Sequence, residues 1–205
     1  MRIEKNRIAE FNGLHTAEHQ RKFDFIAADI PNVEEVLQKL IDFQVAIPSW
    51  ALGTGGTRFG RFATSGGEPS NLEQKIEDVG LLHKLNQSSG AISLHIPWDI
   101  PSDAAKIKAL AAHHGLVFDA MNSNTFQDQP GQKLSYKYGS LQNVDKGIRQ
   151  QAVDHNLEVI KYGKELGSNS LTVWLSDGSS FPGQLNFRKA FQNTLEGLQD
   201  IYAGL

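Results

Sequence analysis

The sequence has 205 residues, 40% of them hydrophobic, which is enough to bury one sizeable core. Its 20 basic and 23 acidic residues leave a formal net charge of -3 with no basic stripe, so we expect no nucleic acid partner. The sequence has no cysteine, which excludes disulfides and thiolate chemistry, and no apolar run long enough to span a membrane. We therefore expect a cytoplasmic protein.

The N-terminal segment, residues 1–44, is predicted to be helical. A helix in two pieces is expected from about His15 to Phe43, because Pro31 and Asn32 interrupt it. After the interruption, apolar residues recur at helical spacing: Val33, Val36, Leu37, Leu40 and Ile41.

From residue 45 onward, short β-branched apolar runs alternate with longer helical patterns, which predicts βα units and a parallel sheet. The expected strands are Val45–Trp50, Ala91–Trp98, Val117–Met121 and Ser170–Leu175. The expected helices are Asn71–Leu85, Asp103–His114, Asp145–Leu166 and a last one from near Asn186 to Tyr202. Their end signals are Asn71 as a cap, Asp103 in a first turn, and Gly115 and Gly167 after the C-termini.

Four βα units correspond to the first half of a (β/α)8 TIM barrel, an α/β fold, over residues 45–205. A closed barrel needs eight units and about 250 residues. The long loops 51–70 and 123–144 both follow strands, which is the barrel face where active sites form. We expect a fragment, or a chain that needs a partner to cover its strand edges; an open four-stranded sheet is the alternative.

His95 and Trp98, near the end of the second strand, are the first candidates for a binding site. A neutral imidazole at a barrel mouth can hydrogen-bond a sugar oxygen or move a proton, and an indole can form an apolar wall. Trp174 has the equivalent position on the fourth strand. The structural alternative is a core histidine satisfied by a backbone carbonyl, with tryptophans that only pack.

The glycine-rich run Gly53–Phe59 does not match a phosphate-binding loop, because no Gly-Lys-Ser/Thr follows it. We interpret it as a turning loop that presents Phe59 outward, to a subunit contact or a substrate lid. The carboxylates at the strand ends are Asp99, Asp119 and Asp177, too few for a convincing oxygen-rich metal site.

Several runs together resemble L-rhamnose isomerase of the branch with broad aldose–ketose specificity. These runs are 46–50 (AIPSW), 53–59 (GTGGTRF), 93–99 (SLHIPWD), 119–126 (DAMNSNTF), 135–141 (SYKYGSL) and the segment from Thr172 to Gly183. They are collinear over nearly the whole chain. A more distant similarity is to xylose isomerase.

The resemblance implies a metal-dependent interconversion of aldose and ketose, often with Mn²⁺, in a homo-oligomer, a tetramer. It implies that His95 contacts the sugar near its ring oxygen, and that Phe59 reaches a neighbouring subunit. It implies an aromatic lining made of Trp50, Trp98, Phe126 and Trp174.

In that family the metal ligands come from the later strands of the barrel. We therefore expect no metal ligand and no catalytic residue in these 205 residues, and an inactive chain by itself. A ketose 3-epimerase of the same barrel class is the alternative enzyme. A non-catalytic sugar-binding or structural half-barrel is the alternative outside catalysis.

Overall fold

The computed structural model describes residues 3–53, 66–176 and 178–205. The helices are α1 (Lys5–Ala27), α2 (Val33–Asp42), a 3-10 turn η1 (Ser49–Ala51), α3 (Leu72–Asn86), α4 (Ala104–His113), α5 (Lys146–Leu166) and α6 (Phe187–Ala203). The strands are β1 (Ala46–Pro48), β2 (Ala91–Ile96), β3 (Val117–Thr125) and β4 (Leu171–Leu175).

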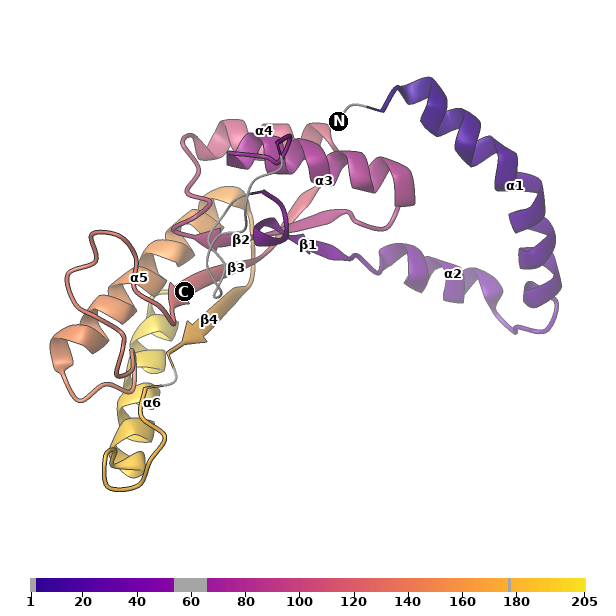
Figure 1. Cartoon of the computed structure of the whole chain (residues 1–205). Coiled ribbons are helices and arrows are strands. Elements are labelled where there is room, and N and C mark those ends of the chain that lie inside the picture. The colour runs from indigo at the N-terminus through magenta and orange to yellow at the C-terminus, as the bar shows by residue number, and fades with distance from the viewer. Residues whose placement is uncertain (1–2, 54–65, 177) are drawn as a thin grey trace.

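The four strands form one parallel sheet in the order β1-β2-β3-β4. Each strand is followed by a helix before its neighbour begins (Figure 1). The predicted α/β fold with a parallel sheet is therefore confirmed. Sequential parallel strands with intervening helices are the arrangement of a (β/α) barrel, whereas a doubly wound sheet reverses its strand order. The complete barrel, like the division into residues 1–44 and 45–205, stays a prediction.

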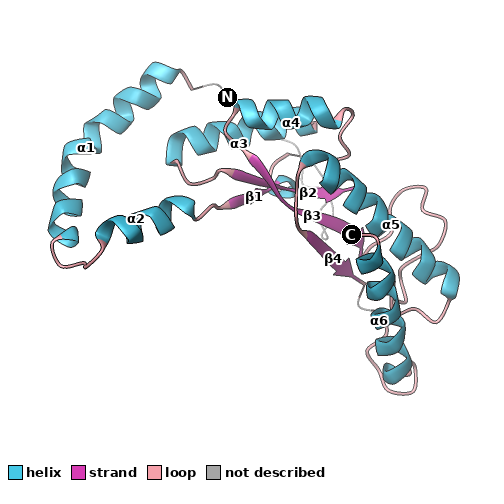
Figure 2. Cartoon of the chain, turned by 180° about the vertical axis from the view of Figure 1, so that it is seen from behind, coloured by secondary structure: helices cyan, strands magenta, loops and turns pink. Residues whose placement is uncertain are grey.

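The outer face of the sheet carries the main hydrophobic core. Side chains alternate along a strand, so Ile92, Leu94 and Ile96 of β2 point to one face, and all three are fully buried. Helices α3, α4 and α5 cover this face (Figure 2). Their buried core residues are Leu72, Ile76, Val79, Ile107, Ala111, Val159 and Leu166.

The inner face of the sheet is polar and aromatic. The register pairs His95 of β2 with Asn122 of β3, and Asn122 with Thr172 of β4. Asn124 pairs with Trp174 two residues further along. Because paired residues of parallel strands point to the same face, these side chains gather on the side opposite the helices.

Capping side chains begin four of the helices: Asn71 and Asp103, which were predicted as start signals, and Asp145 and Asn186, which were not. The side chains of Asn71, Asp103, Asp145 and Asn186 each accept a hydrogen bond from a backbone N–H in the first turn of their helix. At the other end of α5, Gly167 adopts a left-handed conformation, φ 88°, that suits glycine. Asp103 is the cap itself, one position before the turn in which it was expected.

Three of the four predicted strands end at another residue than expected. The first strand keeps only Ala46–Pro48 of the expected Val45–Trp50, because the chain turns into η1 at Ser49. The second strand ends at Ile96 instead of Trp98, at a turn in which Asp99 N–H donates to His95 O. The third continues past Met121 to Thr125, since its backbone pairs with β4 along this length and Asn122 bonds to the Leu94 carbonyl.

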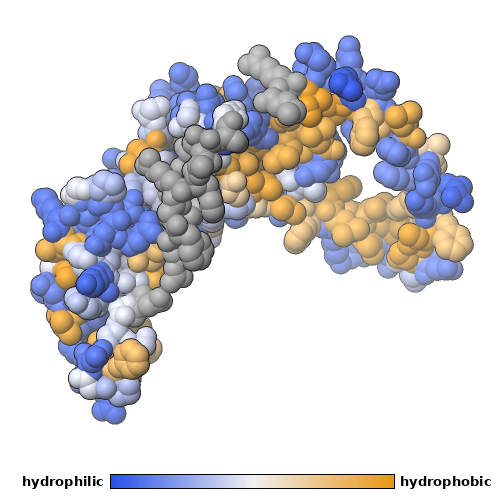
Figure 3. Space-filling model, viewed as in Figure 1, coloured by the Kyte–Doolittle hydropathy of each residue, from blue (hydrophilic) through white to orange (hydrophobic). Residues whose placement is uncertain are grey.

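Helices α1 and α2 form an arm that extends away from the sheet beside β1 (Figure 1). Helix α1 begins at Lys5, ten residues before the expected start, and neither helix buries a residue. Hydrophobic residues gather over α2 (Figure 3), where Leu40 and Ile41 are exposed. The accessible surface of 13440 Å² exceeds the roughly 9500 Å² of a compact monomer of this mass, which reflects the extended shape.

No helix in the described part of the chain is long and apolar enough to cross a membrane.

Candidate functional site

His95 lies at the carboxyl end of β2 inside a cluster of four aromatic rings. The cluster is Trp98, stacked on the imidazole at 4.1 Å between ring centroids, Trp50 edge-on at 5.4 Å, Phe126 edge-on at 5.9 Å, and Trp174 tilted at 6.3 Å. The structure thus brings together five of the six residues predicted to bind substrate. Their functional role stays a prediction at this point.

The imidazole of His95 is held in its neutral form. Burial lowers its pKa from 6.5 to about 4, while the nearby Asp99 carboxylate raises it and His155 and Lys75 lower it. The residue is 2% exposed, and its buried Nε2 atom has no hydrogen-bond partner among the described residues. A buried polar atom without a partner costs free energy, which a ligand that bonds to it would recover.

Two asparagines of β3 stand beside the aromatic cluster. Asn122 donates to the carbonyl oxygens of Leu94 and Ala120, and its Oδ1 accepts from Trp174 Nε1 at 2.9 Å. This bond orients the Trp174 ring toward His95. The side chain of Asn124 is 2% exposed, and in the part of the chain that the structure describes neither its oxygen nor its nitrogen has a partner.

Two further contacts hold the loop and helix that follow β3. Gln129 Oε1 accepts from Trp98 Nε1 at 3.2 Å, so the loop after β3 fixes the ring that stacks on His95. From α5, His155 Nε2 accepts from the backbone N–H of Asn124 at 3.0 Å. Burial lowers the pKa of His155, which keeps this nitrogen available as an acceptor.

A buried charge network lies beneath the aromatic cluster. Oδ2 of Asp99 accepts from Ser49 Oγ at 2.5 Å and from the backbone N–H of His95 at 2.9 Å. Its Oδ1 accepts from Lys75 Nζ of α3 at 2.6 Å, an ion pair whose side chains are 6% and 1% exposed. The strand-end carboxylate Asp99, considered above as a weak metal ligand, therefore serves as a hydrogen-bond acceptor.

The arrangement suits a ligand that has both apolar faces and hydroxyl groups. The faces of indole rings pack against C–H surfaces and exclude water, while the free atoms of His95 and Asn124 offer hydrogen bonds. Both asparagines were missed as site residues. Continuing the two-residue alternation of the third strand past Met121 would have placed them on the same face as His95.

The described residues do not fit a metal ion. Among residues 3–53, 66–176 and 178–205, no group of three or more histidine, aspartate or glutamate side chains could hold one. Asp119 accepts from Ser93 Oγ at 3.0 Å, and Asp177 and Phe59 lie outside the described residues. No step is therefore assigned to a metal here.

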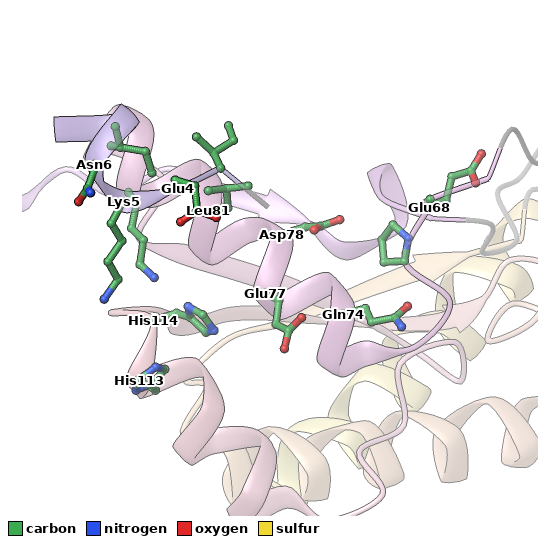
Figure 4. Close-up of a pocket in the computed structure, with 15 residues that line it drawn as sticks. Glu4, Lys5, Asn6, Glu68, Gln74, Glu77, Asp78, Leu81, His113 and His114 are labelled. Atoms are coloured by element: carbon green, nitrogen blue, oxygen red, sulfur yellow. The ribbon is translucent and has the colours of Figure 1, made fainter. Parts of the chain in front are cut away.

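A hollow of about 850 Å³ lies elsewhere, between the start of α1 and the helices α3 and α4. Figure 4 shows its charged lining, with Glu77 and Asp78 on α3 and His113 and His114 at the end of α4. None of the aromatic residues around His95 lines it. The described residues in its lining include no tryptophan, tyrosine or phenylalanine, so the His95 cluster is the better candidate.

Comparison with known proteins gives two similar sequences. The chain is 54% identical over 173 residues to a probable sugar isomerase of Mesorhizobium japonicum, which covers 84% of this chain and 40% of that protein. It is 48% identical over 190 residues to a probable sugar isomerase of Rhizobium meliloti, covering 93% of this chain and 44% of that protein. The chain thus spans about two fifths of the length of these relatives. No family model matches the chain.

Among solved structures, the fold is similar to that of an L-ribulose 3-epimerase. The TM-score is 0.51 at 15% sequence identity, over 78% of this chain and 46% of the other. At this identity the likeness is one of fold alone. By sequence, then, the chain is a homologue of proteins named as probable sugar isomerases, with an α/β fold that also occurs in a sugar epimerase.

Proposed function

We propose that this chain forms the sugar-binding wall of an aldose–ketose isomerase, and that His95 and its aromatic cluster hold the sugar. The observation that carries the proposal is the neutral imidazole of His95, which has a free Nε2 atom in a cluster of four aromatic rings. The two relatives named as probable sugar isomerases support the reaction class.

In the proposed complex, the apolar face of the sugar packs on Trp98 or Trp174. Stacking of this kind removes apolar surface from water and orients the ring. A sugar hydroxyl or ring oxygen bonds to Nε2 of His95, and a second hydroxyl bonds to the amide of Asn124. Both side chains then gain the partners that they lack in the structure.

A neutral imidazole can do more than bind. As a base, Nε2 can accept the proton of the anomeric hydroxyl, and it can then return that proton to the ring oxygen as the cyclic sugar opens. Because the pKa of His95 is about 4, the ring is neutral across the physiological range before the proton transfer begins. We assign to His95 the role of orienting the sugar and moving this proton.

L-Rhamnose is the first substrate to test, from the sequence resemblance. The same resemblance implies Mn²⁺, but the described residues include no set of side chains that could hold it. The proposed role of His95 therefore does not depend on a metal. A homo-oligomer, with Phe59 near a neighbouring subunit, belongs to the same proposal.

The test is a titration of the intrinsic tryptophan fluorescence with L-rhamnose, on the wild-type chain and on His95→Phe. Phenylalanine keeps an aromatic ring on Trp98 and removes the hydrogen bond. We expect saturable quenching in the wild type and a dissociation constant about tenfold higher in the variant, the equivalent of one hydrogen bond of about 1.4 kcal/mol. His113→Gln, far from the cluster, is the matched control and is expected to bind as the wild type does.

Binding that is equal in wild type and His95→Phe would contradict the proposed site. Product analysis separates the reaction classes. An isomerase gives ketose from aldose, and an epimerase gives a second ketose from a ketose with no aldose. Binding with neither product is also what an isomerase wall that is inactive by itself would give, so product analysis decides the reaction class only where a product forms.

A further inference from the structure

The buried carboxylate of Asp99 joins the two chain segments that carry Trp50, His95 and Trp98. The Oδ2 atom of Asp99 accepts two hydrogen bonds, one from the Ser49 hydroxyl at the end of β1 and one from the His95 backbone at the end of β2. The backbone N–H of Asp99 returns a bond to His95 O at 2.9 Å. The ends of two neighbouring strands are thus tied to the same group.

The aromatic rings are direct chain neighbours of these tied positions. Trp50 follows Ser49, and Trp98 precedes Asp99. Trp98 lies parallel to the imidazole, 16° between planes, and Trp50 lies nearly perpendicular, at 80°. A change in the Ser49–Asp99 contact therefore moves the backbone that carries both indoles, relative to the backbone that carries the imidazole.

The third bond anchors this group to the helical layer. Lys75, on α3, pairs with Oδ1 of Asp99 at 2.6 Å, and both side chains are almost completely buried. Hydrophobic residues of similar volume often replace buried ion pairs without loss of stability, so such a pair is a weak device for stability alone. A role in holding a single conformation is the better-attested reason for a protein to keep a buried ion pair.

We propose that Asp99 is the positioning residue of the sugar site, which sets the packing of His95 between Trp50 and Trp98 through Ser49 and the His95 backbone. Asp99 acts through other residues, since its side chain is 1% exposed and both its oxygens are already bonded. The relevance to sugar binding rests on the proposed function, whereas the positioning of the rings does not.

The test compares two serine-to-alanine variants that each remove one hydroxyl donor to an aspartate. Ser49→Ala removes the bond to Asp99, and Ser93→Ala removes the 3.0 Å bond to Asp119 from the same sheet face. Two readouts are taken: the NMR signals of the His95 ring protons, which the stacked Trp98 shifts through its ring current, and the dissociation constant for L-rhamnose.

We expect Ser49→Ala to move the His95 ring signals toward unstacked values and to weaken sugar binding about three- to tenfold. Ser93→Ala is expected to leave both readouts at their wild-type values, although it also removes a serine–aspartate hydrogen bond, one that is only partly buried. Asp99→Asn, which keeps the side-chain shape, is the second variant and is expected to displace the same ring signals.

Equal effects of Ser49→Ala and Ser93→Ala on the ring signals would overturn the inference, as would unchanged signals in Asp99→Asn. If the wild-type chain binds no sugar, the proposed function fails while the ring signals still decide the positioning role. If the wild-type chain binds sugar but the His95 ring signals are unchanged in Ser49→Ala, the positioning role fails and the proposed function stands.

Discussion

The burial of neutral His95 predicts that the chain loses stability in mild acid. The imidazole has a pKa of about 4 when folded and 6.5 when exposed, so the unfolded chain binds the proton more readily. A group whose pKa is lowered on folding contributes stability that is fully present above pH 6.5 and is lost as the pH falls toward 4. Between pH 7.5 and pH 5, these two pKa values correspond to a loss of about 2 kcal/mol.

His95→Phe isolates this contribution, because the variant keeps a ring at the same place and has no proton to bind. Urea unfolding at pH 7.5 and pH 5 gives the change in the free energy of unfolding for each protein. The difference between the two changes is the His95 contribution, since the carboxylates and the other histidines are common to both. We expect the wild type to lose about 2 kcal/mol more than His95→Phe over this range.

An identical loss in both proteins would refute the reasoning. It would mean that His95 is protonated or accessible to water in the folded chain, and that the site lacks the buried neutral imidazole on which the proposed chemistry depends. A direct check is the titration of the His95 ring by NMR in the folded chain, which should show a neutral ring at pH 6.

Three further predictions concern the stability of the fold: the buried ion pair beneath the site, two glycines in helices, and the cap of α5. Asp99→Ala leaves the buried Lys75 ammonium without its carboxylate and should cost about 3–5 kcal/mol in urea unfolding, whereas Glu35→Ala, which breaks the exposed Lys39–Glu35 pair, should cost less than about 1 kcal/mol. Gly80→Ala places a Cβ 2.6 Å from the His114 ring and should lower the melting temperature; Gly13→Ala, with nothing within 4 Å, should instead raise helicity by circular dichroism. Asp145→Ala removes the cap of α5 and should cost about 1 kcal/mol of unfolding free energy, a loss that Asp145→Asn should largely avoid.

The regular part of the fold followed from local sequence patterns. The cap Asn71 and the alternating apolar residues Ile92, Leu94 and Ile96 of β2 act over a few positions, so the sequence predicts them directly. The strand order could be anticipated as well, because βα units place successive strands side by side.

The errors arose where tertiary contacts override local preference. The polar run after Met121 reads as loop, yet it continues as strand because Asn122 bonds across to Leu94 and Trp174. The strand before Trp50 ends early because Ser49 reaches Asp99, fifty residues away in the chain. Neither partner is visible to a window of neighbouring residues.

The sequence predicted the aromatic part of the candidate site but not its polar framework. His95 and the aromatic residues stand out by type and by their position at strand ends. The polar framework does not, since Lys75 reads as an ordinary charged helix residue until the structure shows it buried against Asp99. Asn124 is equally inconspicuous in the sequence, and it became a candidate only because the structure shows its buried amide without a partner among the described residues.

The most direct test of the central claim is the ¹⁵N chemical shift of His95 Nε2, measured at neutral pH while L-rhamnose is added. The account predicts a neutral imidazole whose Nε2 signal moves saturably with sugar, while the signals of His155, which is already bonded to the backbone of Asn124, change little. An Nε2 signal that stays fixed while the sugar binds would place the sugar elsewhere and contradict the account.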